Sequence, residues 1–234
     1  MPRSRPRVLG GLLLVAALGV SGGVALAAPE DALMPVEKYT TAKGKSLATA
    51  HRSRLLEFST QIYNCLPWVA VYPGGLGFPQ ERGNQNDDRY LSTWIWVDQR
   101  EDAVFAALSR DRRVSAMFSR YGVDLLRRMT ELSDVLDDSN VTGFSVVLSW
   151  LKPGTSRPGG KAVNETLALF VDKATAMDFL AKRVAPEEFT SRSKFTLFDG
   201  VDPVGRVPLE VWEDTFNSTF KVSAYEPPKG AQCQ

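Results

Sequence analysis

The fold is decided by residues 143–171, which read GFSVVLSWLKPGTSRPGGKAVNETLALFV. In the first nine residues every second side chain is large and apolar, which predicts a strand with one buried face. The side chains expected on that face are Phe144, Val146, Leu148 and Trp150. A loop at 153–160 contains three glycines and two prolines, and residues 164–171 return as a second apolar strand. The segment therefore predicts an antiparallel hairpin.

The regions on both sides of this hairpin predict further elements. Strands are expected at 92–97, 194–198, 207–212 and 219–225, with a strand or extended segment at 68–72 and a turn-rich loop at 73–77. Helices are expected at 46–64, around 114–118 with a stop near Gly122, from Asp124 to Leu136, and from Asp172 to just before Pro186. A further helix is expected to begin at a capping box formed by Asp98 and Glu101. Because hairpin-type connections dominate, the predicted fold is α+β, with a mainly antiparallel sheet packed against several helices in a single domain.

The N-terminus predicts an exported protein. Three arginines precede an apolar run from Val8 to Leu26, which ends in the small residues expected at a signal-peptidase site. The alternative is a membrane anchor, but five glycines weaken the run as a permanent helix and no basic stop-transfer flank follows. We expect a signal peptide at 1–27, a tether at 28–43, a globular domain at 44–226 and a tail at 227–234. The expected location is the periplasm or the extracellular space.

The charge balance argues against a nucleic-acid or lipid-surface partner. The chain has 28 basic and 27 acidic residues, and three of the basic ones lie in the signal peptide, which leaves 25 against 27. Such a balanced chain has no basic footprint for phosphates. We expect no nucleic-acid partner, no membrane span after cleavage, and an envelope or extracellular ligand that the sequence does not identify.

Two cysteines, Cys65 and Cys233, are present. In an oxidising compartment an even count favours a disulfide. A bond between them would join the polar C-terminal tail to the body of the domain, whereas the alternative is two unpaired thiols. We expect the disulfide.

The sequence offers no metal site, cofactor motif or catalytic set. His51 is the one histidine, and with two cysteines this excludes the His-pair and Cys-rich zinc sites. Its place on an apolar helical stripe favours a structural hydrogen bond at the edge of the core over a role as general base. The glycines at 74, 75 and 77 match no phosphate-binding pattern. We therefore expect no cofactor, no metal and no catalytic residue.

Two pairs of residues are candidates for binding. Trp94 and Trp96 share one face of a strand, where two indoles can stack on sugars or peptides; the competing interpretation, which we favour here, is burial beneath a helix. Asp87 and Asp88 lie in the polar stretch 79–89, the most loop-like interior segment. This stretch resembles the start of a calcium loop but lacks its glycine and its final glutamate.

The favoured interpretation is a non-catalytic binding or envelope-accessory protein. The first alternative is a small secreted hydrolase that uses carboxylates; spacing selects no pair among Asp87, Asp88, Glu101, Glu210, Glu213 and Asp214. The second is a glycan-binding module that uses Trp94 and Trp96. The sequons at Asn140, Asn164 and Asn217 would be glycosylation sites in a eukaryotic secretory pathway.

Overall fold

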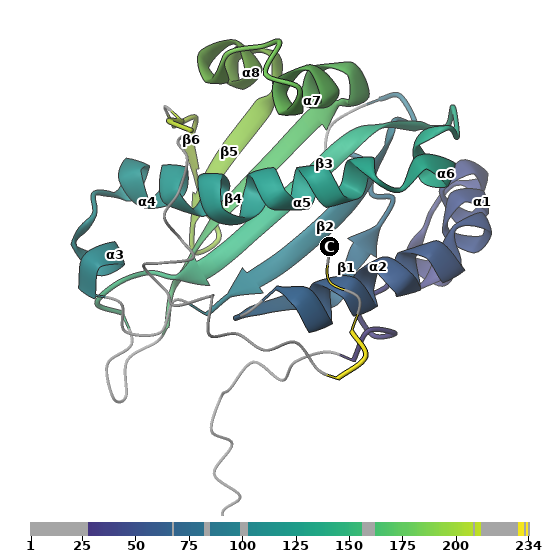
Figure 1. Cartoon of the computed structure of the whole chain (residues 1–234), viewed down its shortest axis with the longest axis horizontal. Coiled ribbons are helices and arrows are strands. Elements are labelled where there is room, and N and C mark those ends of the chain that lie inside the picture. Colours follow the sequence, from purple (N-terminus) through teal and green to yellow (C-terminus); the bar gives the residue numbers. More distant parts are fainter. Residues whose placement is uncertain are drawn as a thin grey trace, which may run out of the picture.

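A computed structural model describes residues 28–66, 68–81, 85–98, 103–155, 162–207, 209–211, 229–231 and 233. Its sheet has the strand order β1-β2-β3-β4-β5-β6. The strands are β1 (Val69–Gly77), β2 (Arg89–Val97), β3 (Val141–Leu151), β4 (Asn164–Asp172), β5 (Lys194–Asp199) and β6 (Asp202–Gly205). All neighbours pair antiparallel except β2 and β3, which run parallel. The predicted α+β fold with a mainly antiparallel sheet is confirmed (Figure 1).

The predicted hairpin forms the centre of this sheet. β3 and β4 pair without a register shift from Gly143 opposite Asp172 to Leu151 opposite Asn164. Trp150 is fully buried, as the alternation predicts. Asp172 then accepts a hydrogen bond from the backbone N–H of Thr175 and caps α7, again as predicted.

Helices make the long connection that a parallel strand pair needs between β2 and β3. They are α3 (Ala103–Ala107), α4 (Arg110–Met117), a π-helical turn (Phe118–Gly122), α5 (Val123–Thr130) and α6 (Ser133–Leu136). The predicted stop near Gly122 is wrong, because Gly122 keeps helical dihedrals. A Cβ on Gly122 would lie 2.4 Å from a ring carbon of Phe118, so the glycine makes room for that ring inside a continuing helix.

The remaining helices are α1 (Ala42–Ala50) and α2 (Arg52–Cys65) near the N-terminus, and α7 (Lys173–Leu180) and α8 (Pro186–Arg192) after β4. The single helix expected at 46–64 is divided at His51, which leaves helical geometry. Residues 28–43, expected as a tether, instead pack on the domain: Ala32, Leu33 and Tyr39 are buried, and Leu33 forms a bridge to Leu76 of β1. A short 3-10 turn, Val36–Lys38, lies within this segment.

Two strand predictions differ from the structure. The loop expected at 73–77 belongs to β1, whose register shifts between Val71 and Leu76. Residues 207 and 209–211 are not a strand; Val207 and Leu209 are buried against the core instead, and the backbone N–H of Glu210 donates to Ser115. The strand expected at 219–225 and the signal peptide at 1–27 lie outside the described residues.

The described helices lie on one face of the sheet. Figure 1 shows α2 crossing in front of β1 and α5 crossing in front of the central strands, with α7 and α8 near the ends of β4 and β5. The burial of β4 follows this arrangement: Glu165, Leu167, Leu169 and Val171 are buried and the residues between them are not. Antiparallel sheets commonly keep one face open to solvent in this way.

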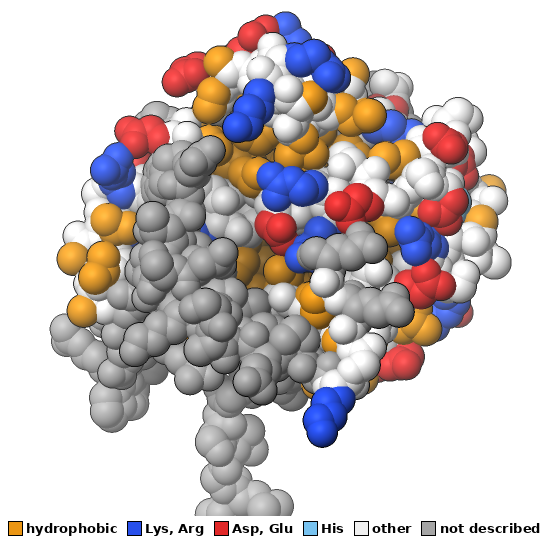
Figure 2. Space-filling model, in the orientation of Figure 1, with side chains coloured by type: hydrophobic (Ala, Val, Ile, Leu, Met, Phe, Trp, Pro, Cys, Tyr) orange, Lys and Arg blue, Asp and Glu red, His pale blue; other side chains and the backbone are white. Residues whose placement is uncertain are grey.

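The helical face carries charges of both signs. In Figure 2 the described Lys, Arg, Asp and Glu side chains are interspersed over this face. Among the described residues, no helix has the length and apolarity to cross a membrane.

Candidate binding surface

The sheet face that points away from the helices, called the open face below, carries a group of aromatic side chains. They are Tyr72, Tyr90, Trp94, Trp96, Phe170 and Phe198. Small and hydroxyl side chains separate them in the strand register: Trp96 is opposite Ser149, which is opposite Thr166, which is opposite Phe198. Of these six side chains, Trp94 is exposed and the other five are partly buried. Exposed apolar groups that gather on one face of a protein are candidates for an interaction site.

The prediction that Trp94 and Trp96 are buried beneath a helix is wrong. Trp94 is 39% exposed, and Trp96, on the same face, is only partly buried. The reason is the phase of β2: the positions that face the helices are occupied by Leu91, Thr93, Ile95 and Val97, each fully buried. The two indoles therefore project from the opposite side of the strand.

Trp94 is held in a fixed orientation. Its Nε1 donates to Oγ of Ser149 at 2.9 Å, and that hydroxyl is 2.9 Å from Oγ1 of Thr166. The ring of Tyr72 stacks on the indole with centroids 4.4 Å apart and planes 30° from parallel. Burial raises the pKa of Tyr72, although a hydrogen bond with Ser149 lowers it in part. The result is a rigid pair of rings with exposed surface.

The irregularity in β1 makes this stack possible. Between Val71 and Leu76 the strand leaves its register with β2, and Gly74 adopts a positive φ of 68°. A Cβ on Gly75 would lie 2.9 Å from the carbonyl oxygen of Trp94 and 3.0 Å from its Cβ. Glycine at 75 thus lets β1 approach Trp94, which brings Tyr72 onto the indole.

A second aromatic contact lies near the start of β2. Tyr90 meets Phe170 edge to face, with centroids 5.1 Å apart. In the register, Phe170 is opposite Ser145, which is 1% exposed. The Oγ of Ser145 has no hydrogen-bond partner in the described part of the chain.

Asp87 is bound to groups outside this surface. Asp87 accepts from Nε of Arg89 at 2.5 Å, and its backbone carbonyl accepts from Lys43. Burial raises the pKa of Asp87, but hydrogen bonds from Thr41 and Arg89 outweigh it, and the net pKa is below the ordinary value. Arg89 is 3% exposed and also donates to the carbonyl of Phe78, so Asp87 neutralises a buried cation at the start of β2. Asp88 is partly buried and lies near Tyr90, whose pKa is raised first by burial and then by the charges of Glu81 and Asp88.

His51 makes the contact expected of a structural histidine. Its Nε2 is 3.2 Å from Oδ2 of Asp138, and its ring packs against Phe78. The backbone N–H of Asn140 holds the pKa of Asp138 below 3.8, with a further contribution from His51. Lys173 donates to the carbonyls of Leu136 and Asp138 at the end of α6.

This contact predicts a pH-dependent contribution to stability. A carboxylate whose pKa is lowered by folding stabilises the protein above its unfolded pKa, and the effect disappears as the pH falls through the folded pKa. We expect Asp138→Asn to lower the free energy of unfolding by about 1.5 kcal/mol at pH 7 and by much less at pH 3. Urea unfolding of both proteins at pH 7, 5 and 3 measures this. An equal difference at all three values would contradict the account.

The other acidic candidates are not gathered in one place. Glu210 pairs with the exposed Arg112, while Glu101, Glu213 and Asp214 lie outside the described residues. Glu165 is 1% exposed and accepts hydrogen bonds from Arg113 and from Nε1 of Trp150 beneath α4. Within the described ranges, no three His, Cys, Asp or Glu residues lie close enough together to hold a metal ion.

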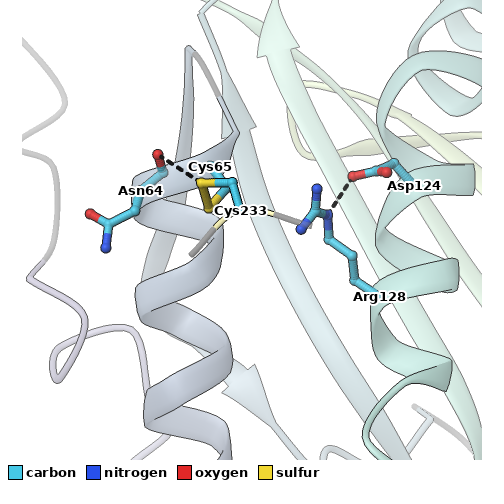
Figure 3. The surroundings of a disulfide bond; sticks show 5 residues. All are labelled: Asn64, Cys65, Asp124, Arg128 and Cys233. Atoms are coloured by element: carbon cyan, nitrogen blue, oxygen red, sulfur yellow. Dashed lines mark hydrogen bonds and ion pairs between the residues drawn. A yellow bond between two sulfur atoms is a disulfide. The ribbon is translucent and has the colours of Figure 1, made fainter. Parts of the chain in front are cut away.

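The predicted disulfide is confirmed. Cys65 and Cys233 are bonded, with Cα atoms 5.4 Å apart (Figure 3). The bond ties the C-terminal end to α2, beside the Arg128–Asp124 ion pair of α5 that Figure 3 also shows. A shallow cavity of about 530 Å³ lies between α2 and the tail. Its lining is Ser53, Leu56, Glu57, Thr60, Gln61, Asn64, Cys65, Gly230 and Ala231.

Comparison with known proteins assigns the chain to no family. No family model matches the chain, and no curated protein or solved structure matches it significantly. Function is therefore argued from the surface itself.

Proposed function

We propose that this chain is an exported, non-catalytic binding protein that holds a carbohydrate on the open face. The observation that carries the proposal is Trp94, a 39% exposed indole fixed by Tyr72 and Ser149. A ring already held in place loses little conformational entropy when a ligand stacks on it, so its exposed surface contributes efficiently to affinity. The apolar C–H face of a sugar ring can stack on such an indole.

Export is part of the same proposal. It is supported by the signal-like N-terminus and by the disulfide, a bond that persists in oxidising compartments. An N-terminal sequence of the exported protein that begins near Ala28 is the expected result, and an intact Met1 in a membrane fraction would contradict it.

The first test of binding is the Trp94→Ala variant. Loss of one aromatic stacking partner costs about 1–3 kcal/mol, so we expect retention to be about 5- to 150-fold weaker on the polysaccharide that the wild type binds. The panel consists of cellulose, chitin and dextran, and retention is measured by affinity electrophoresis or depletion from solution. Because Trp94 is exposed, circular dichroism should show an intact fold.

Tyr63→Ala is the matched control. Tyr63 is also an exposed aromatic, at 46%, but it belongs to α2 on the helical side of the sheet. Its loss should leave retention unchanged. Equal retention of wild type and Trp94→Ala, or no retention of the wild type on any polysaccharide, would contradict the proposed function.

A further inference from the structure

We propose that the open face prefers a cationic glycan, an oligosaccharide with free amino groups, and that the carboxylates of Glu81, Asp88 and Asp172 select it. These three side chains surround Tyr90 at one end of the open face, called the acidic end below. The inference rests on the proposed function and specifies its ligand. Its supports are the position of the carboxylates, their excess over nearby cations and the rings beside them.

The strand register places Asp172 beside Tyr90. Tyr90 is opposite Gly143 of β3, which is opposite Asp172 of β4. Because neighbouring strands lie about 4.8 Å apart, the Cα atoms of Tyr90 and Asp172 are about 10 Å apart. Asp172 follows Phe170 at the next alternate position of β4 and is exposed, and the glycine between the two strands carries no side chain. The phenol and the carboxylate therefore border the same part of the open face.

The loop between β1 and β2 brings the other two carboxylates to this end. The carboxylate of Glu81 accepts a hydrogen bond at 2.7 Å from Lys194, which begins β5. Since β3 and β4 separate β2 from β5, this ion pair shows that the loop reaches across the ends of these strands. Asp88 directly precedes β2, two residues before Tyr90.

Negative charge prevails around the phenol of Tyr90. Burial is the main cause that raises the pKa of Tyr90, and all three carboxylates of the acidic end raise it further, while Lys194 lowers it. A phenol is harder to ionise where the surrounding charge is negative. Among the described residues that act on Tyr90, three carboxylates against one ammonium leave an excess of two negative charges.

Two further cations near the start of β2 are held by other groups. Arg89 is 3% exposed and donates to Asp87 and to the carbonyl of Phe78. Lys43 donates to the backbone carbonyl of Asp87. A cationic ligand at the acidic end therefore meets negative charge that the described cations do not balance, whereas an anionic ligand is repelled.

The rings on this face suit a cation as well as a sugar. An ammonium group is attracted to the faces of Trp and Tyr rings, and Trp94 and Tyr90 lie on the same side of β2. Four residues separate them, which at about 3.3 Å per residue is about 13 Å along the strand. A single sugar ring on Trp94 does not span this distance, whereas an oligosaccharide does and brings its amino groups to the acidic end.

The experiment compares the hexamer of β-1,4-linked glucosamine with the hexamer of β-1,4-linked N-acetylglucosamine by calorimetric titration. The two ligands share one backbone and differ in the charge of their nitrogen. At about pH 5.5, where the amines are protonated and the carboxylates ionised, we expect the glucosamine hexamer to bind about tenfold more tightly at low salt, from a few exposed charge pairs. In about 0.5 M salt this preference should fall to within about twofold, because exposed charges are then screened.

The double variant Glu81→Gln/Asp88→Asn removes the excess negative charge. It should reduce the low-salt preference from about tenfold to within about twofold, with an intact fold by circular dichroism. The matched control is Glu57→Gln/Glu131→Gln, which removes the same charge from exposed positions of α2 and the end of α5 on the helical side. The control should keep the full preference.

Four outcomes would overturn the inference. Equal affinity for the two hexamers, or a preference that persists in Glu81→Gln/Asp88→Asn, shows that the acidic end does not select the ligand; if binding of the neutral hexamer needs Trp94, the proposed function stands. An equal loss in the control variant would assign the preference to the overall charge of the protein. Hexalysine that binds as tightly as the glucosamine hexamer would assign the acidic end to a basic peptide. Failure of both hexamers to bind overturns the inference, and failure on every polysaccharide overturns the proposed function also.

Discussion

Replacing Glu165 by alanine is expected to destabilise the protein by about 3–5 kcal/mol, because it leaves the cation of Arg113 without its counter-charge. Glu165 is 1% exposed, and the side chain of Arg113 is 11% exposed. The carboxylate also accepts from Nε1 of Trp150, at 2.8 Å. In a domain of this size the loss corresponds to a fall of roughly 10 °C in the melting temperature. Thermal unfolding followed by circular dichroism measures it.

Glu210→Ala is the matched control for this prediction. Glu210 pairs with Arg112, the residue before Arg113, but both partners are more than half exposed. Pairs of this kind contribute about 0–1 kcal/mol, so the melting temperature should hardly change. Similar shifts for Glu165→Ala and Glu210→Ala would show that the buried pair does not have the role assigned to it.

Replacing Cys65 by serine is expected to cost about 3–5 kcal/mol. The bond closes a loop with a sequence separation of 168, and cross-links that close long loops restrict the unfolded chain most in the chain-entropy model. The same change releases the tail that forms one wall of the cavity beside α2. Urea unfolding under non-reducing conditions measures the free energy.

Cys233→Ser provides the control, because either substitution removes the same bond. The two single variants and the double variant should be equally stable, and all should match the reduced wild type. Additive losses in the double variant would mean that the thiols contribute separately. Unchanged stability in all three would contradict the prediction.

The fold could be predicted from the sequence where patterns are local. The alternation in 143–151 and the glycine-rich loop after it specify the central hairpin, and Asp172 marks the start of α7. The parallel pairing of β2 with β3 was not predicted, because strand order depends on how the intervening helices pack. The interruption at His51 was missed for a similar reason: its contact with Asp138 joins residues 87 positions apart.

The candidate site was only partly visible in the sequence. Trp94 and Trp96 could be placed on one face of a strand, but alternation alone does not say which face of a strand a helix will cover. Tyr72 and Ser149 were missed as supports of Trp94. The signals were present in the glycines after Tyr72 and in the serines that alternate with large apolar residues of β3. Neither pattern identifies its partner until the sheet is assembled.

The central claim is that ligands bind the open face through Trp94, and NMR titration tests it most directly. The chain has five tryptophans, so the indole N–H signals of a ¹⁵N-labelled sample can be assigned individually by substitution. On addition of the hexamer of N-acetylglucosamine or glucose that binds, the account predicts that the indole signal of Trp94 and the amides of β2 and β3 shift, while those of α2 and α5 do not. Shifts confined to α2 and the tail beside its cavity, with Trp94 unchanged, would contradict it.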